Sequence, residues 1–262
     1  MNPMNHSPSP IMYSRILKTW TASIGLGIKK TLAYPLSLGN APLRSLIIVG
    51  MMILVWQALF PQKLNYLAYF VAAYFFLFPV WWTQAAEEYT QEVVRGWHLA
   101  ITKPVSPISY HIASSVGEWL MDIAVELPIG LALVFIFHLP IALNLLPLLW
   151  VVLFLWRIAE VYFLMGFSYF FYSIWGFTVS FRLSEIFLSG MFVPLAFISS
   201  SLRKALSVLP FYHSGYSMIE MFITGKLNVL SLLILLVWSL VLIVAGYFIH
   251  AKGWKRFESQ GG

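Results

Sequence analysis

The chain has 262 residues, of which 60% are hydrophobic and 10% are charged, and its mean hydropathy is +0.81. Soluble domains carry about 25% charged residues, so this composition excludes an ordinary soluble domain and indicates an integral membrane protein. The absence of cysteine excludes disulfides, thiolate metal sites and thiol nucleophiles. The net charge of +6 is typical of a membrane protein with basic cytoplasmic loops, and we expect no nucleic-acid partner.

Residues 11–38 form the first predicted element, an amphipathic helix. Its apolar residues recur every four positions, at Ile16, Trp20, Ile24, Ile28 and Leu32. A basic helix with tryptophan on its apolar side is typical of a helix that lies along the membrane surface. A short helix packed against other spans is the alternative.

Six apolar segments approach the roughly 20 residues that a membrane-crossing helix needs. They are Ser45–Phe60, Tyr66–Trp82, Ile108–Phe137, Leu145–Tyr172, a fifth that begins near Leu183, and Val229–Ile249. Backbone polar groups must be satisfied within each segment in lipid, and no alternating pattern indicates a barrel. We therefore expect an all-α protein with six transmembrane helices that forms one membrane domain over 1–262. Ser173–Arg182 is expected to be a short connection.

Most Lys and Arg residues fall on one side of the membrane if the N-terminus is inside, which places both termini in the cytoplasm. The chain between the fifth and sixth spans must then begin and end outside. We expect residues 199–225 to be external or re-entrant. Within them, Leu202–Leu209 has an apolar stripe at helical spacing, with Ser201 as a candidate N-cap.

Ionisable residues also occur inside the predicted spans. Glu118, Asp122 and Glu126 are spaced by four and share one face of the third span, while Arg157 and Glu160 share a face of the fourth. Unpaired charges at mid-bilayer cost at least about 2.5–3.5 kcal/mol each, so we expect Glu126 and Arg157 to pair. The charges are either a structural clamp or a polar route that favours cationic or protonatable substrates.

The only long hydrophilic stretch between spans covers residues 85–106. A charged helix with a few apolar contacts suits docking in the groove of a soluble partner, although a solvated loop is the alternative. The residues that carry this interpretation are Glu87, Glu88, Glu92, Arg95, Gly96, Leu99, Lys103 and Pro104.

Three motifs in order along the chain resemble one family, the membrane subunits of type-2 ATP-binding-cassette (ABC) exporters. The first is Arg95-Gly96 with Leu99, Lys103-Pro104 and Ser106; the second is Ser189-Gly190 with Pro194-Leu195 and Leu209-Pro210-Phe211; the third is Arg256-Phe257-Glu258 with Gly261-Gly262. The similar branch contains bacterial permeases that are encoded beside a separate ATPase and a second permease. The absence of an importer-type E-A-A-x-x-x-G loop favours export.

This resemblance implies roles for two segments. Glu87–Ala100 would be the coupling helix that receives motion from an ABC ATPase subunit. The outer gate would contain Gly190, Pro194, Leu206, Pro210 and Phe211. The chain would work in the bacterial cytoplasmic (inner) membrane, in contact with lipid, as a homodimer or as a heterodimer with a second six-span permease.

The chain itself has no nucleotide-binding motif. Thr224-Gly225-Lys226 is similar to the end of a phosphate loop, but Glu220 stands where the first glycine belongs and Leu227 replaces the Ser or Thr. We therefore expect no enzyme activity, cofactor or metal in this chain, and ATP and Mg²⁺ in the partner. The rival hypothesis is an ATP-independent membrane protein, such as a lipid scramblase or an assembly factor. An intramembrane enzyme is disfavoured because no nucleophile or metal triad accompanies the buried acids.

Overall fold

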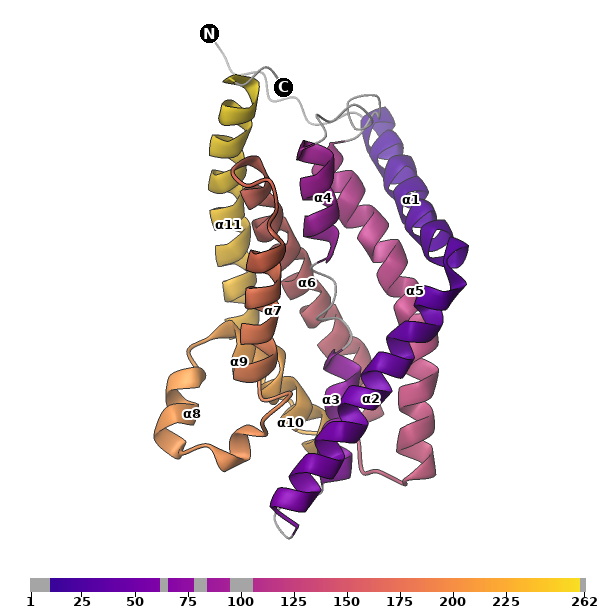
Figure 1. Cartoon of the computed structure of the whole chain (residues 1–262), viewed down its shortest axis with the longest axis vertical. Coiled ribbons are helices and arrows are strands. Elements are labelled where there is room, and N and C mark those ends of the chain that lie inside the picture. The colour runs from indigo at the N-terminus through magenta and orange to yellow at the C-terminus, as the bar shows by residue number, and fades with distance from the viewer. Residues whose placement is uncertain (1–9, 62–65, 78–83, 95–105, 260–262) are drawn as a thin grey trace.

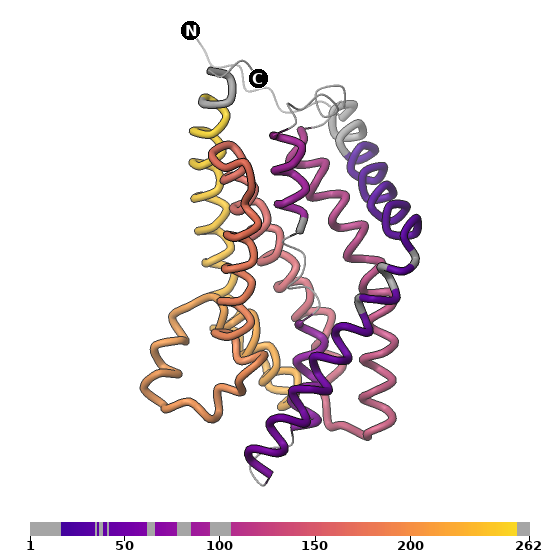
Figure 2. Tube along the Cα trace, viewed as in Figure 1, coloured from indigo at the N-terminus to yellow at the C-terminus, as the bar shows by residue number. Residues whose placement is uncertain are grey.

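The computed structural model describes residues 10–61, 66–77, 84–94 and 106–259, which form helices and connecting loops without a strand (Figures 1 and 2). The all-α prediction is therefore confirmed. The main helices are α1 (Pro10–Ala33), α2 (Pro35–Leu59), α3 (Tyr66–Leu77), α4 (Gln84–Val94), α5 (Pro107–Ile136), α6 (Leu146–Met165), α7 (Trp175–Leu188) and α11 (Val229–Ser259). The short ones are η2 (Leu143–Leu145), η3 (Gly166–Tyr169), η4 (Leu195–Phe197), α8 (Ser200–Leu206), α9 (Pro210–Ser214) and α10 (Tyr216–Thr224).

The helices form an elongated bundle with two distinct ends (Figure 1). The first turn of α1, α4 and the last turn of α11 lie together at one end, which we call the α4 end. The short helices α8, α9 and α10 lie at the opposite end, which we call the α10 end. Between the two ends, α5, α6, α7 and α11 run in alternating directions.

Four helical segments of the described chain are long and apolar enough to cross a membrane. They are Pro42–Leu59, Pro107–Ile136, Leu143–Tyr169 and Val229–Lys255. Of the other two predicted spans, the second is represented by α3, with 12 residues, and the fifth by α7, with 14. The structure thus supports a membrane protein with four helices of full spanning length.

Helix α7 begins earlier than the sequence predicts, so the expectation of a connection over Ser173–Arg182 is wrong for most of its length. The helix starts at Trp175, where the amide of Thr178 donates to the carbonyl of Ile174. The polar side chains that suggested a connection find partners in α4 instead: Glu87 accepts a hydrogen bond from Thr178. These internal contacts allow a partly polar sequence to remain helical inside the bundle.

Helix α1 packs along α5, and this is the most extensive contact between any two helices of the described chain. The backbones approach closely because Gly27 faces Ser114 and Gly117 faces Ile24. The predicted helix over residues 11–38 is divided at Tyr34, because a residue before proline disfavours the helical conformation and Pro35 starts α2. The structure agrees with the packed alternative for this helix.

Helix α3 forms the centre of the larger hydrophobic core and is buried on all sides. Its aromatic residues pack against neighbouring helices; Phe75 and Phe76, for example, contact Phe222 of α10 edge to face. A second apolar cluster lies around α4, where Tyr89 and Ala86 are fully buried. The charged groups described next lie beside these two cores.

Candidate functional site

The three acidic residues of α5 face α1 and α2. Glu118 Oε1 lies 3.0 Å from Nζ of Lys30 in α1, and the same Nζ lies 2.6 Å from Oε2 of Glu88 in α4. Burial lowers the pKa of Lys30, but the hydrogen bond to Glu88 and the charges of Glu118 and Glu88 raise it by more, so the net pKa lies above its usual value. The bridge connects α1, α4 and α5, and because it is half-exposed its contribution to stability is about 1 kcal/mol at most.

Glu126 lies deeper in the bundle and is 1% exposed. Its Oε1 accepts a hydrogen bond from the Ser45 hydroxyl of α2 at 3.0 Å, and its Oε2 accepts one from the hydroxyl of Tyr74 in α3. Arg44 of α2 attracts both Asp122 and Glu126 electrostatically. The acidic row of α5 is therefore compensated by groups from several neighbouring helices.

A second charged group is enclosed between α6, α7 and α9, and we call it the Arg157 cluster (Arg157, Glu160, Glu185 and Ser214). Arg157 Nη1 lies 2.6 Å from Glu160 Oε2 and 2.5 Å from Glu185 Oε2, and Nη2 donates to Glu185 Oε1 at 2.8 Å. The Ser214 hydroxyl donates to Glu185 Oε1 at 2.9 Å. All four residues are at most 1% exposed, so this cluster fixes three helices to one another.

The predicted pairing of Glu126 with Arg157 is replaced by these two separate arrangements. Arg157 binds Glu160 and Glu185, while Glu126 binds hydroxyl groups. The reason is the early start of α7, which brings Glu185 to the level of Arg157. The expectation that buried charges face the bundle and are paired is otherwise consistent with the geometry.

Helix α4 is connected to helices on both sides of it. Thr178 of α7 donates to Glu87 Oε1 at 2.5 Å, and Arg182 of α7 lies 3.9 Å from the same oxygen. Glu92 Oε2 lies 3.0 Å from Nε2 of the buried His111 of α5, which forms an ion pair when the imidazole is protonated. Together with the Glu88 bridge to α1, these contacts join α4 to three other helices.

Hydroxyl groups attach the same helix to η3 at the end of α6. The hydroxyls of Tyr89 and Tyr169 lie 2.6 Å apart, and those of Thr90 and Ser168 lie 2.7 Å apart. Burial, with a further contribution from Tyr169, raises the pKa of Tyr89, so this phenol stays neutral. These two hydrogen bonds join α4 to η3.

The predicted coupling residues divide into two groups. Glu87, Glu88 and Glu92 lie on α4, which packs into the bundle, and of these Glu88 is exposed. The remaining predicted residues lie outside the described part of the chain: Arg95, Gly96, Leu99, Lys103 and Pro104.

The predicted outer segment forms a chain of short elements at the α10 end (Figure 1). Gly190 has φ +78, and its carbonyl accepts a hydrogen bond from Tyr69 at 2.7 Å. A side chain there would be strained and would meet Leu195, with a Cβ only 2.8 Å from Cγ. Helix α7 ends at Leu188, before Gly190, and Pro194 immediately precedes η4.

The end of this outer segment returns to the bundle. The predicted helix Leu202–Leu209 is observed in part as α8, which starts two residues earlier and ends at Leu206. Its N-cap is Ser199 rather than Ser201, and the Ser199 hydroxyl accepts a hydrogen bond from the amide of Leu202. Leu206 is the last residue of α8, and the buried Pro210 starts α9. Phe211 packs edge to face against Trp156 and Phe181. The structure therefore brings part of the predicted gate into contact with α6 and α7.

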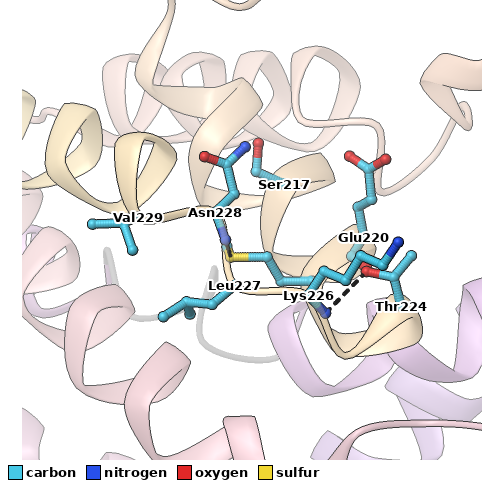
Figure 3. A pocket seen from close by; sticks show the side chains of 8 residues that line it. Ser217, Glu220, Thr224, Lys226, Leu227, Asn228 and Val229 are labelled. Carbon is cyan, nitrogen blue, oxygen red and sulfur yellow. Dashed lines mark hydrogen bonds between the residues drawn. The ribbon is translucent and has the colours of Figure 1, made fainter.

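A pocket of about 590 Å³ lies where α10 turns into α11 (Figure 3). Its lining residues are Ser217, Glu220, Met221, Thr224, Lys226, Leu227, Asn228 and Val229. Gly225 makes this turn with φ +69, and the Lys226 amide donates to the Thr224 hydroxyl. The tripeptide Thr224–Lys226 thus belongs to a helix end and its following turn. Within the described ranges, no group of three His, Asp or Glu residues could hold a metal ion.

Several residues of these sites are missed by reasoning from sequence alone. Glu185 is the only acidic residue between Glu160 and Glu220, and its position inside an apolar run was a usable signal. Ser214 and Thr178 carry no such signal, because hydroxyl residues occur throughout the chain. Their roles follow only from the packing of α7 and α9.

No model of a known protein family matches this chain, and no curated protein matches it.

Proposed function

We propose that the chain is the transmembrane permease subunit of a type-2 ABC exporter, driven by a separate ATPase. The four helices of full spanning length and the absence of a strand from the described residues support the membrane part of this proposal. The proposal keeps the six predicted crossings, which contain α2, α3, α5, α6, α7 and α11. The order of the three sequence motifs supports the family.

The contacts of α4 are the observation that carries this proposal. An exporter driven by a separate ATPase needs an element at the cytoplasmic end that transmits movement to several spans at once. Helix α4 lies at one end of the bundle and contacts α7 through Glu87, α1 through Glu88 and α5 through Glu92. Its amphipathic, acidic sequence precedes Arg95-Gly96, where we place the contact with the ATPase.

The Arg157 cluster connects this end to the outer gate in the proposed mechanism. Glu185 of α7 binds Arg157 of α6 and Ser214 of α9, the short helix that begins at Pro210. A movement of α4 that displaces α7 through Thr178 therefore changes the position of α9 as well. Alternating access follows if ATP binding and hydrolysis switch the α7–α9 unit between two positions.

The remaining parts of the proposal concern placement and partners. The α4 end faces the cytoplasm of a bacterial inner membrane, because basic residues Lys252 and Lys255 end α11 there. The α10 end, with Lys204 exposed, faces outward. The permease forms a homodimer or pairs with a second six-span permease, and the substrate path lies between the two halves.

Charge reversal at Arg95 tests the proposal. Affinity purification of the tagged full chain from native membranes should recover an ABC ATPase, and Arg95→Glu should release it without reducing the amount of folded permease. The matched control is Lys204→Glu, a reversal at the α10 end that should leave the ATPase bound. A chain that purifies without any ATPase contradicts the proposal and supports an ATP-independent function such as lipid scrambling.

A further inference from the structure

The Arg157 cluster contains more carboxylates than cations. Arg157 is its only cation, whereas both Glu160 and Glu185 contact the guanidinium group. All three side chains are at most 1% exposed, so bulk water does not reach them. Two carboxylates that share one site do not both ionise readily, because each disfavours the charge of the other.

The two carboxylates are engaged unequally. Glu185 receives two hydrogen bonds from Arg157 and a third from Ser214. Glu160 receives one hydrogen bond at Oε2, and among the described residues its buried Oε1 has no hydrogen-bond partner. A carboxylate anion offers about four acceptor positions, and leaving most of them empty in a dry interior is unfavourable. Glu185 is therefore the stable anion of the pair.

The neighbouring charges do not remove this imbalance. Arg182 of α7 also attracts Glu160 electrostatically, but it lies 3.9 Å from Glu87 of α4. The two arginines therefore face three carboxylates, namely Glu87, Glu160 and Glu185. Arg44 of α2 also acts electrostatically on Arg182, but it is attracted to two further carboxylates, Asp122 and Glu126, and so does not redress this excess. The carboxylate beside Arg157 with the fewest hydrogen bonds is Glu160.

We propose that the Arg157 cluster is a proton-binding site, in which Glu160 carries the proton and Glu185 remains ionised. The proton sits on Oε1, because Oε2 accepts the hydrogen bond from Arg157. Neutral Glu160 removes the excess charge and loses less on burial than an anion would. Because the site is closed by α6, α7 and α9, separation of α7 from α6 admits water and allows Glu160 to release its proton.

Infrared difference spectroscopy of the purified full chain in lipid nanodiscs at neutral pH tests this proposal. Glu160→Gln should remove a carbonyl band of a protonated carboxylic acid. Glu185→Gln should remove the same component, because Glu160 then ionises to pair with Arg157. The control variant is Glu126→Gln, which removes a buried acid on α5. The carboxylic-acid band of Glu160 should persist in its spectrum. None of these readouts depends on an ATPase or on transport.

Three results would overturn the proposal. An unchanged carboxylic-acid region in the spectrum of Glu160→Gln shows that Glu160 is ionised. A Glu160→Gln protein that does not fold also contradicts it, since glutamine matches a protonated glutamate in size and neutrality. Finally, a thermal stability that rises with Na⁺ or K⁺ in the wild type but not in Glu160→Gln assigns the site to a metal cation instead.

Discussion

The crossing of α1 and α5 is tested by one methyl group at Gly27. A Cβ atom there would overlap the carbonyl oxygen of Ser114 and would lie 2.9 Å from the carbonyl carbon of the same residue and 3.2 Å from the amide nitrogen of Glu118. Non-bonded carbons pack at about 3.5–4.0 Å, and the overlap with the Ser114 oxygen is closer still, so the two backbones must separate by more than about 0.6 Å. Overpacking of this kind costs about 1–3 kcal/mol, against a gain of roughly 1 kcal/mol for alanine over glycine in a helix. We expect Gly27→Ala to lower the free energy of unfolding by up to about 2 kcal/mol.

Gly25 supplies a matched control in the same helix, because a Cβ atom at this position has no neighbour within 4 Å. Gly25→Ala should therefore gain only the helix propensity of alanine and stabilise the protein by up to about 1 kcal/mol. Thermal unfolding of the purified full chain in detergent compares the two variants, and the shifts should have opposite signs. If Gly27→Ala stabilises the protein as much as Gly25→Ala, α1 does not cross α5 at this point, and a helix lying along the membrane surface is favoured.

Four further predictions concern single side chains. Arg157→Met leaves buried carboxylates without their cation and should lower the free energy of unfolding by about 3–5 kcal/mol. This loss should be seen as disappearance of the monodisperse peak in size-exclusion chromatography. Thr178→Val should leave the ATPase bound but lower the ATP hydrolysis rate of the complex several-fold, whereas Thr178→Ser, which keeps the hydroxyl, should not. Asp122→Asn should impair export without loss of folded protein if this acid contacts substrate; equal loss of both indicates a structural clamp. Burial lowers the pKa of His213, and the hydrogen bond with the Ser207 carbonyl offsets this decrease only in part. The folded protein therefore holds His213 neutral, which costs no stability above the unfolded pKa of about 6.5. As the pH falls below that value, the unfolded chain takes up a proton at His213 more readily than the folded protein, and stability is lost. The thermal midpoint should decrease between about pH 7 and pH 5, and less steeply in His213→Gln.

Long apolar segments could be predicted from sequence with small errors. The third span was expected at Ile108–Phe137 and α5 covers Pro107–Ile136, and the last span and α11 both begin at Val229. These helices are defined by long, predominantly apolar runs, which leave little freedom in their positions. Helix α7 was placed too late, because its first eight residues, Trp175–Arg182, include polar side chains whose partners belong to another helix.

This error explains why the candidate site was predicted only in part. Arg157 and Glu160 are recognisable as buried charges because they interrupt an apolar run and lie three residues apart. The depth of Glu185, the third member of the cluster, follows from the residue at which α7 begins. Because the sequence places that start near Leu183, it predicts no contact between Glu185 and Arg157. Likewise, nothing in the apolar sequence around Tyr74 indicates that its hydroxyl binds Glu126. Pairing between distant segments is a property of tertiary packing, which periodicity does not contain.

The proposed transmission of ATP-driven movement through α4 and α7 is tested most directly by a distance measurement. Because the chain has no cysteine, spin labels can be attached specifically to cysteines introduced at the exposed positions Leu120 of α5 and Ser184 of α7. In the complex with its ATPase, adding ATP and Mg²⁺ should change the distance between the labels, while the isolated chain should show no change. A distance that is the same with and without ATP in the complex would contradict the account.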